Sequence, residues 1–363
     1  KLWLNQLFVF DGRASTRAIA MTDLVVHQPL LKPFVKDEPL TLAEVAQVKE
    51  LLATHKSLDL FPGQVAGTGM FSAAMAGSAG DQASTGYNNV WVRDNIFLAH
   101  SLYTTNADGR GVQAACDVLA SLSKFFLKFS VRFDDCISGK ADKSDPMQRP
   151  HIRFNGDNLA ENKEFWNHKQ NDALGYFIWM RCKLCTDGVM AIEDDHLRLL
   201  GLMCEYLAKI EYWCDEDNGH WEEATKVEAS SIGPVLAGVK EFKKVLAQNS
   251  GMTAPCSAET LELLVAKGEE ALNVILPNEC VQEGKQRDSD GALIFLVYPL
   301  DIVTPAMAKQ IMEITTEKIV GPIGVRRYNG DSYWCKDYKD KTGGDATKAY
   351  TDEEMKERDK LAV

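Results

Sequence analysis

Apolar residues along most of the chain recur at spacings of three and four, which is typical of helices with one buried side. The clearest stripe lies within residues 193–214 and consists of Leu197, Leu200, Cys204, Leu207 and Ile210. The same periodicity predicts further helices over residues 95–105, 111–137 and 173–185. The pattern therefore indicates a mainly helical protein.

Helix boundaries are marked by capping residues at several places. Thr41 and Glu44 have the spacing of a capping box, in which each side chain binds the backbone of the other. The apolar positions that follow on one helical face are Val45, Val48, Leu51 and Leu52. A helix is therefore predicted to begin just after Thr41.

Two later helices have equally clear ends. Ser257 caps a segment that stops at Pro277. Thr304 and Pro305 open another segment, which is expected to end near Gly321. Strand patterns are few, and the two best are the short apolar runs Leu4–Phe10 and Leu293–Tyr298.

Long polar segments separate the predicted helices at 62–89, 138–170, 214–229 and 277–291. Helices joined alternately by short and long connections indicate helix pairs arranged in a ring or a stack. The long segments would then gather on one face, where binding sites tend to lie. We predict an all-α fold with its functional site in these loops.

Composition narrows the ligand classes. The 363 residues carry a formal net charge of −12, which disfavours a nucleic acid partner and suits a neutral ligand such as a sugar. No apolar run approaches the roughly 20 residues of a membrane span, so no membrane partner is expected. Nine cysteines, an odd number, and the lack of an Asn-x-Ser/Thr site favour a reducing, intracellular compartment. The sequence leaves the oligomeric state open.

The first candidate loop, Tyr87 to Asn95, places Trp91, Arg93 and Asp94 at the entry to a helix. Aromatic rings cover the apolar face of a sugar, and the two charged side chains bind its hydroxyls. The alternative is that Asp94 caps the helix with Arg93 as its local partner. In the second loop, residues 165–175, Trp166 and Asp172 lie just before the next helix and could also bind a sugar. The alternative there is a well-capped helix with a packed tryptophan.

The third loop contains Trp221, Glu222 and Glu223 in a Gly- and Asp-rich stretch that ends before Ser230-Ser231, where the next helix starts. A carboxyl group beside an indole is partly desolvated, which raises its pKa and keeps it protonated as a general acid. Such an acid is what cleavage of a glycosidic bond requires. The fourth loop, 325–334, offers Arg327 among aromatic residues as a second arginine for hydroxyl binding.

In chain order, the four loops read Tyr-x-x-x-Trp-x-Arg-Asp, Trp-x-x-x-Gln-x-Asp, Trp-Glu-Glu followed by Ser-Ser, and Arg-Tyr-x-x-Asp-x-Tyr. This combination resembles glycoside hydrolase family 15, which includes glucoamylases and glucodextranases. The segments Val-Trp-Val-Arg-Asp-Asn and Glu-Ala-Ser-Ser-Ile-Gly also resemble the glucoamylase-like domain of the phosphorylase kinase α and β regulatory subunits. The resemblance covers residues 60–335.

The resemblance implies an (α/α)6 barrel with a funnel-shaped site formed by the long loops. In it, Glu222 matches the general acid and Glu223 a neighbouring binding carboxylate. The residues that would bind the glucose at the non-reducing end, or line its pocket, are Tyr87, Trp91, Arg93, Asp94, Trp166, Asp172, Trp221 and Arg327. No cofactor and no metal is implied. Asp94, paired with Arg93, is expected to remain ionised.

The implied domain organisation has three parts: an N-terminal extension over 1–60 that packs on the barrel, a glucoamylase-like domain over 61–335, and a charged tail over 336–363. An inverting hydrolase also needs an ionised carboxylate about 6.5–9.5 Å across the site. The motif of this second carboxylate is not found in the sequence. In the family that the chain resembles, this carboxylate lies well downstream of the fourth loop. Three alternatives stay open: the chain stops short of the last helices, these helices follow on a separate piece, or the domain has lost its base.

The expected function is therefore an exo-acting, inverting α-glucoside hydrolase that releases β-glucose from the non-reducing end of α-glucans or oligosaccharides. The alternative is a non-catalytic glucan-binding regulatory or scaffold domain. The sequence does not separate α-1,4 from α-1,6 linkages, nor polymers from oligosaccharides.

Three further sequence features are less well supported as functional sites. Cys182 and Cys185, with Cys214 and His220, could be assembled into a zinc site, but the first two lie at the end of an apolar helix and suit buried structural positions better. His168 and His220 either tune proton transfer or are ordinary hydrogen-bonded residues. No Gly-rich phosphate loop is present in the sequence.

Overall fold

The computed structural model describes residues 30–34, 36, 38–54, 64–65, 67–73, 86–106, 109–249, 255–321 and 324–331. The helices in these ranges are α1 (Leu42–Thr54), α3 (Val92–Thr105), α4 (Gly111–Lys128), α5 (Val131–Ser138), α6 (Asn171–Thr186), α7 (Asp194–Ile210), α8 (Ala229–Gln248), α9 (Ala258–Ile275), α10 (Ile294–Val297) and α11 (Pro305–Lys318). Short 3-10 helices are η2 (Lys32–Phe34), η4 (Pro146–Gln148) and η5 (Gly291–Leu293). The run Leu4–Phe10 and the tail 336–363 lie outside the described residues.

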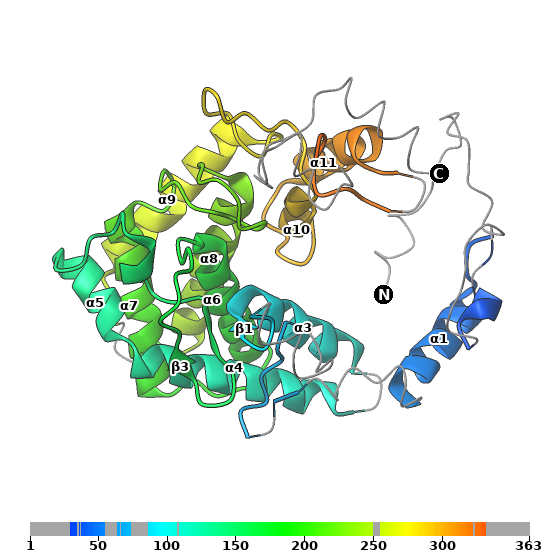
Figure 1. Cartoon of the computed structure of the whole chain (residues 1–363), viewed down its shortest axis with the longest axis horizontal. Coiled ribbons are helices and arrows are strands. Elements are labelled where there is room, and N and C mark those ends of the chain that lie inside the picture. The colour runs from blue at the N-terminus through cyan, green and yellow to red at the C-terminus, as the bar shows by residue number, and fades with distance from the viewer. Residues whose placement is uncertain are drawn as a thin grey trace.

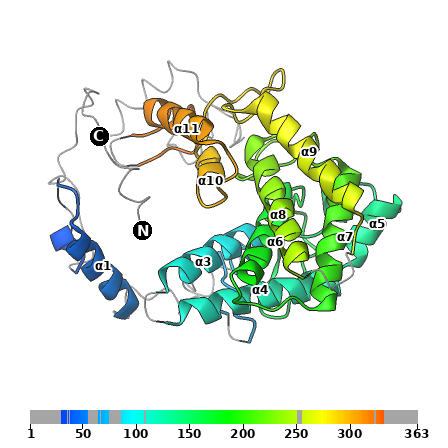
Figure 2. The ribbon, with the colours of Figure 1, turned by 180° about the vertical axis from the view of Figure 1, so that it is seen from behind.

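The helices form two layers along an arc, as Figures 1 and 2 show from opposite sides. The inner layer consists of α3, α6, α8 and α10, and the outer layer of α4, α7, α9 and α11. Neighbouring inner helices pack together, most extensively α6 with α8, and so do the outer pairs α4 with α7 and α7 with α9. Short connections lead from an inner helix to the following outer helix, and long ones lead back to the next inner helix. This is the predicted alternation.

The innermost packing depends on small residues. Nearly every residue of α6 is buried, because α3, α4 and α8 all pack against it. A Cβ atom on Gly175 would lie 2.4 Å from the backbone nitrogen of Val235 in α8. A Cβ on Gly238 of α8 would lie 2.8 Å from the carbonyl oxygen of Gly175. The two backbones therefore touch where α6 and α8 cross.

Several predicted helix boundaries are present. The stripe within 193–214 is buried along α7. Ser257 accepts a hydrogen bond from the Thr260 backbone nitrogen (3.0 Å) at the start of α9. Thr304 accepts one from the Met307 nitrogen (3.3 Å) at the start of α11, which ends at Lys318 rather than Gly321. Local capping signals thus located both helices.

The capping box at the start of α1 also forms. The Thr41 nitrogen donates to Glu44 Oε2 (2.7 Å), and the Glu44 nitrogen donates to Thr41 Oγ1 (3.3 Å). The helix nevertheless lies apart from α3–α11 in both views, and Val45 is 40% exposed. The expected burial of Val45 is therefore not found.

The single helix expected over 111–137 is divided into α4 and α5 at Phe129 and Ser130. The bend lets Phe133 pack against Phe126 of α4 and against Tyr206 of α7. Neither Gly nor Pro marks the break, so tertiary packing and not local sequence decides it.

The strand expected at Leu293–Tyr298 is wrong, because η5 and α10 occupy this segment. The Asp290 side chain accepts a hydrogen bond from the Ala292 nitrogen (2.8 Å) and starts the helical turn. A short apolar run fits a buried helix as well as a strand. The observed strands are β1 (Val90–Trp91), β2 (Arg153–Asn155) and β3 (Ala160–Glu161), which form a small antiparallel sheet.

Candidate active site

The long loops meet at the amino-terminal ends of α3 and α6, and Arg93 lies at their centre. Its Nε donates to Asp172 Oδ2 (2.5 Å), and its Nη2 donates to Asp172 Oδ1 (3.0 Å). Nη2 also donates to the carbonyl oxygen of Gly219 (2.8 Å), in the loop between α7 and α8. Both charged side chains are buried. Arg93 therefore joins three segments that are far apart in sequence, two by the ion pair and the third by the bond to Gly219.

Asp94 is not the hydrogen-bonded partner of Arg93, in contrast to the sequence interpretation. The guanidinium binds Asp172, 79 positions away, while Asp94 is exposed at the first turn of α3. Helical geometry explains this, because adjacent residues point in directions about 100° apart. Although Asp94 as a residue is exposed, desolvation of its carboxyl group raises its pKa, and the charge of Arg93 offsets part of this rise.

Glu222 lies against the same arginine. Its Oε1 is 3.8 Å from Arg93 Nη1 and accepts a hydrogen bond from Gln170 Nε2 (3.1 Å). Gln170 in turn accepts from Arg93 Nη2 (2.7 Å), which fixes its amide orientation. Burial raises the pKa of Glu222, and the opposing charge of Arg93 and the Gln170 bond offset part of this rise. The side chain is 28% exposed, so a ligand can reach a carboxyl group whose pKa lies above its ordinary value.

Glu222 also has an unusual backbone conformation. Its φ of 59° lies in the left-handed region, which costs about 1 kcal/mol or more for a residue other than glycine. Such strain persists only where neighbouring contacts hold the loop. The side chains of Trp221 and Glu223, on either side of Glu222, supply those contacts.

Glu223 is buried and bound by protein groups. Its Oε2 accepts from Arg287 Nη2 (2.8 Å), and its Oε1 accepts from the Tyr328 hydroxyl (2.6 Å). Arg327 Nη1 is 3.3 Å from Oε1. Glu223 thus anchors the Glu222 loop to the fourth loop.

Trp221 is held on the other side of Glu222. Its Nε1 donates to Asp290 Oδ1 (2.8 Å), and Asp290 Oδ2 accepts from Arg287 Nη1 (3.0 Å). The Arg327 guanidinium lies 5.5 Å from the Trp221 ring centre. Sequence reasoning missed Arg287 and Asp290, although both lie in a predicted long loop at a spacing of three residues.

Aromatic residues from the first two loops form a continuous cluster. The Tyr87 and Trp91 ring centres are 6.3 Å apart, and those of Trp91 and Trp166 are 5.5 Å apart with nearly perpendicular planes. Arg153 of β2, which the sequence did not single out, lies 5.0 Å from the Trp91 ring centre and 4.5 Å from that of Trp166. Tyr87 is 45% exposed, so the cluster reaches the surface.

A buried pair of carboxyl groups lies under the Glu222 loop, at the start of α8. Glu279 accepts hydrogen bonds from the Ser230 hydroxyl (2.5 Å) and the Ser230 nitrogen (3.2 Å). Burial and the neighbouring Asp290 raise the pKa of Glu279 to about 8. Burial also raises the pKa of Glu228, whose side chain is 3.2 Å from Lys226 Nζ.

His168 accepts a hydrogen bond from the Ile152 nitrogen (3.2 Å), whereas the buried Nδ1 of His220 has no partner among the described residues. His168 stacks on His151 at 3.7 Å, and burial lowers the pKa of His168 to about 2. His220 packs against Phe295, and burial lowers the pKa of His220 to about 3. Both imidazoles are therefore neutral near pH 7.

The residues considered as zinc ligands are not gathered around a metal site in the described structure. Cys182 is buried in α6, and Cys185 accepts a hydrogen bond from Arg181 Nη1 (2.7 Å). Across the described ranges, no three His, Cys, Asp or Glu side chains are placed to hold a metal ion. In the same ranges, no helix is long and apolar enough to span a membrane.

A two-layered helical fold that gathers carboxyl groups, a buried arginine and aromatic rings at its loop end has the groups that can bind a sugar. Comparison of the sequence with known families agrees. The chain belongs to the glycosyl hydrolases family 15, which matches residues 59–358. A carbohydrate ligand is implied by this family.

Individual relatives match parts of the chain. The uncharacterized lipoprotein YgeQ from Escherichia coli (strain K12) is 32% identical over 152 residues, which is 38% of this chain and 56% of the relative. A probable phosphorylase b kinase regulatory subunit alpha from Caenorhabditis elegans is 22% identical over 270 residues, which is 68% of this chain and 21% of the relative. The chain thus spans about a fifth of that protein. Among solved structures, a wild-type glycosidase is similar with a TM-score of 0.62 and 21% identity, over 82% of this chain and 76% of that one. A bacterial glucoamylase complexed with acarbose has a TM-score of 0.50 and 16% identity, over 73% and 40%. These likenesses establish a glucoamylase-like fold.

Proposed function

We propose that this protein is an exo-acting, inverting hydrolase of α-glucosides, with Glu222 as the general acid. The observation that carries the proposal is the state of Glu222: a reachable carboxyl with a raised pKa, beside Trp221 and hydrogen bonded to Gln170. A protonated carboxyl in this position can donate its proton to a glycosidic oxygen while water attacks the anomeric carbon from the opposite face. β-Glucose is then the product.

The other groups have distinct roles in this proposal. The exposed Asp94 carboxylate accepts hydrogen bonds from the hydroxyls of the non-reducing glucose, and the Tyr87, Trp91 and Trp166 rings cover its apolar face. Arg93, held by Asp172, positions Gln170 and Glu222. Contacts of Glu223, Trp221 and Arg327 hold the loop that contains Glu222 in place.

The proposal also concerns the overall architecture of the domain and the second carboxylate that an inverting hydrolase needs. The inner and outer helix pairs of the proposed domain, residues 61–335, would form part of an (α/α)6 barrel, which further helices outside this range would close. The ionised carboxylate that activates water would come from a loop across the funnel, about 6.5–9.5 Å from Glu222.

A second function is supported by one comparison. The relative from Caenorhabditis elegans is a regulatory subunit, so the same pocket could bind glucans without hydrolysing them. The two functions share the ligand and differ in turnover.

One experiment separates them. The protein is incubated with maltose, isomaltose and maltotriose, and the anomer of any released glucose is followed by proton NMR. Release of β-glucose supports the inverting hydrolase, and release of α-glucose contradicts the inverting mechanism. Chemical-shift changes on sugar binding without turnover support the regulatory function. Absence of both turnover and binding contradicts both functions.

A further inference from the structure

The small sheet beside the site has two faces, and an arginine lies on each. Trp91 of β1 is directly opposite Arg153 of β2, and both side chains lie in the aromatic cluster. Phe154, the next residue, points the other way and stacks on Phe125 of α4. Glu161 of β3, opposite Phe154, binds Arg132 of α5 on that second face.

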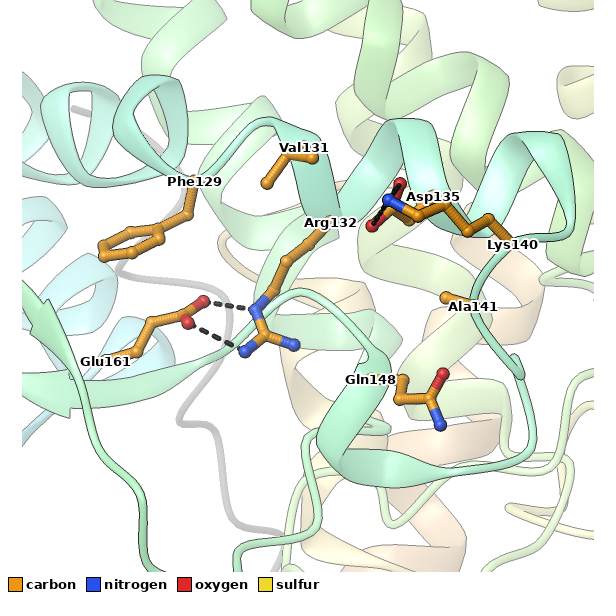
Figure 3. Close-up of a pocket in the computed structure, with 8 residues that line it drawn as sticks. All are labelled: Phe129, Val131, Arg132, Asp135, Lys140, Ala141, Gln148 and Glu161. Atoms are coloured by element: carbon orange, nitrogen blue, oxygen red, sulfur yellow. Dashed lines mark hydrogen bonds and ion pairs between the residues drawn. The ribbon is translucent and has the colours of Figure 1, made fainter.

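The two arginines differ in how their donors are used. Arg132 forms a two-point ion pair with Glu161 and donates from Nη1 to the Met147 carbonyl oxygen (2.8 Å). This pairing is drawn in Figure 3, where Arg132 lines a surface cavity of about 430 Å³. The cation on this face is therefore neutralised within the protein.

Arg153, in contrast, binds no carboxylate within 4 Å in the described part of the chain. Its recorded hydrogen bond runs from Nη2 to the Gly86 carbonyl oxygen at 3.3 Å, and its buried Nε has no protein partner among those residues. A buried cation with unused donors is costly unless another group accepts from them. The nearly perpendicular Trp91 and Trp166 rings leave its guanidinium in the corner between them.

The location of Arg153 indicates which part of a ligand it would meet. Arg93 and Asp172 are buried and form the floor of the site. Tyr87 of the aromatic cluster is 45% exposed and marks the rim of the site. Arg153 is tied to Gly86, which directly precedes Tyr87, so it belongs to the rim side. In an exo-acting enzyme the terminal glucose reaches the floor and the leaving-group sugar lies nearer the rim.

The charges around Arg153 favour a neutral ligand. The acidic groups that act on it are Glu164 and Glu222, and the exposed Asp94 adds a further negative charge to the site. The whole chain carries −12. An anionic ligand would be repelled, whereas a sugar ring offers acceptor oxygens to the guanidinium and an apolar face to the indoles.

We infer that Arg153 is a further substrate-binding residue, which donates hydrogen bonds to the leaving-group sugar of an α-glucoside. The inference rests on the proposed ligand class and on the proposed position of the terminal glucose. It predicts that Arg153 distinguishes a disaccharide from glucose, because glucose alone fills only the floor of the site.

Binding to the full chain carrying Glu222→Gln, which prevents turnover, tests this inference. Tryptophan fluorescence is titrated with glucose, maltose and maltotriose, since Trp91 and Trp166 flank the arginine. Adding Arg153→Met keeps the aliphatic stem between the rings and removes the donors. We expect the Kd for maltose and maltotriose to rise about tenfold or more, the Kd for glucose to change little, and Arg153→Lys to recover part of the loss.

Matched controls separate binding from folding. Arg132→Met removes the arginine on the opposite face and should leave all three Kd values unchanged. The thermal unfolding midpoint of each variant reports its stability. An unchanged maltose Kd in Arg153→Met, or an equal loss for glucose and maltose, would overturn the inference while leaving the proposed function intact. If the Glu222→Gln parent binds none of the three sugars, both the inference and the proposed ligand class are wrong.

Discussion

Asp172 receives two hydrogen bonds from Arg93, although the two residues are 79 positions apart in sequence. The pair is buried at the meeting point of α3 and α6. Removing one partner of such a pair leaves an uncompensated buried charge, which is more harmful than the absence of both charges. The pair is therefore a sensitive point for stability as well as for site geometry.

Asp172→Asn should lower the free energy of unfolding by about 3–5 kcal/mol, because Arg93 then lacks its buried counter-charge. Urea denaturation measures the change. Asp195→Asn is the control, since the Asp195–Arg198 pair is mostly exposed and should contribute less than about 1 kcal/mol. Equal losses in the two variants would contradict the proposed importance of the Arg93–Asp172 pair.

Glu222→Gln should reduce turnover of maltose by a factor of about 10²–10⁴, since the amide cannot donate the catalytic proton. The Kd for maltose should change little, because the side chain keeps its size. Glucose release and fluorescence titration measure the two quantities. Glu193→Gln, on the exposed loop before α7, serves as the control. Normal turnover by Glu222→Gln would remove Glu222 from the mechanism.

The pH dependence of turnover should respond to Gln170. A general acid works protonated, so the rate falls as pH rises through its pKa, and the raised pKa of Glu222 places this fall above the ordinary glutamate range. The Gln170 hydrogen bond stabilises the ionised form and lowers the pKa of Glu222. In Gln170→Leu, the alkaline limb of the kcat profile should therefore move to higher pH.

The control for this shift is Gln113→Leu, because Gln113 binds Asp117 on the exposed side of α4. Its profile should match that of the unmodified protein. A limb that moves to lower pH in Gln170→Leu would show that Gln170 acts on Glu222 in the opposite sense.

Glu279 makes stability depend on pH. Its pKa is about 8 in the folded protein, above the ordinary value of 4.5, so the folded state binds the extra proton between these values. This contribution to the free energy of unfolding is fully present below pH 4.5 and is lost as pH rises through about 8. Glu279→Gln cannot ionise, so its stability should decline less from about pH 5 to about pH 8.

Urea denaturation at several pH values tests this prediction, with the surface variant Glu262→Gln as the control. An equal decline in Glu279→Gln and in the unmodified protein would mean that Glu279 is already ionised in the folded state throughout this range.

Gly175→Ala should destabilise the protein by about 1–3 kcal/mol, because the added Cβ would lie 2.4 Å from the Val235 nitrogen and force α6 away from α8. Gly324→Ala is the control, since its Cβ would meet no heavy atom of the described residues within 4 Å. Thermal unfolding measures both. An unchanged thermal unfolding midpoint in Gly175→Ala would show that α6 and α8 can move apart without loss of stability.

The parts of the fold predicted correctly from sequence depend on local rules. The caps at Thr41, Ser257 and Thr304 involve bonds to residues only three positions away, so the sequence displays both partners. The break at Phe129 depends on packing of Phe133 against α7, which no local pattern encodes. The short strand segments are below the length at which alternation is recognisable.

The candidate site shows the same limit. Trp91, Arg93, Glu222 and Arg327 were found because their motifs resemble a known family. The partners that give them geometry are distant in sequence: Arg287 lies 64 positions from Glu223, and Gln170 lies 52 positions from Glu222. Arg153 has no motif of its own, and its interest comes only from the absence of a carboxylate beside it in the described structure.

The anchoring of Glu223 has a consequence for how the protein matures during synthesis. The strained backbone at Glu222 is held through Glu223 by Arg287 and by Tyr328, whose hydroxyl accounts for one carboxylate oxygen. The ribosome adds Tyr328 more than a hundred residues after Glu223. Helices α3–α9 can therefore pack on the nascent chain before Tyr328 is present to bind Glu223 and hold the loop that contains Glu222. The Glu222 carboxyl group would acquire its folded conformation only as one of the late events of folding.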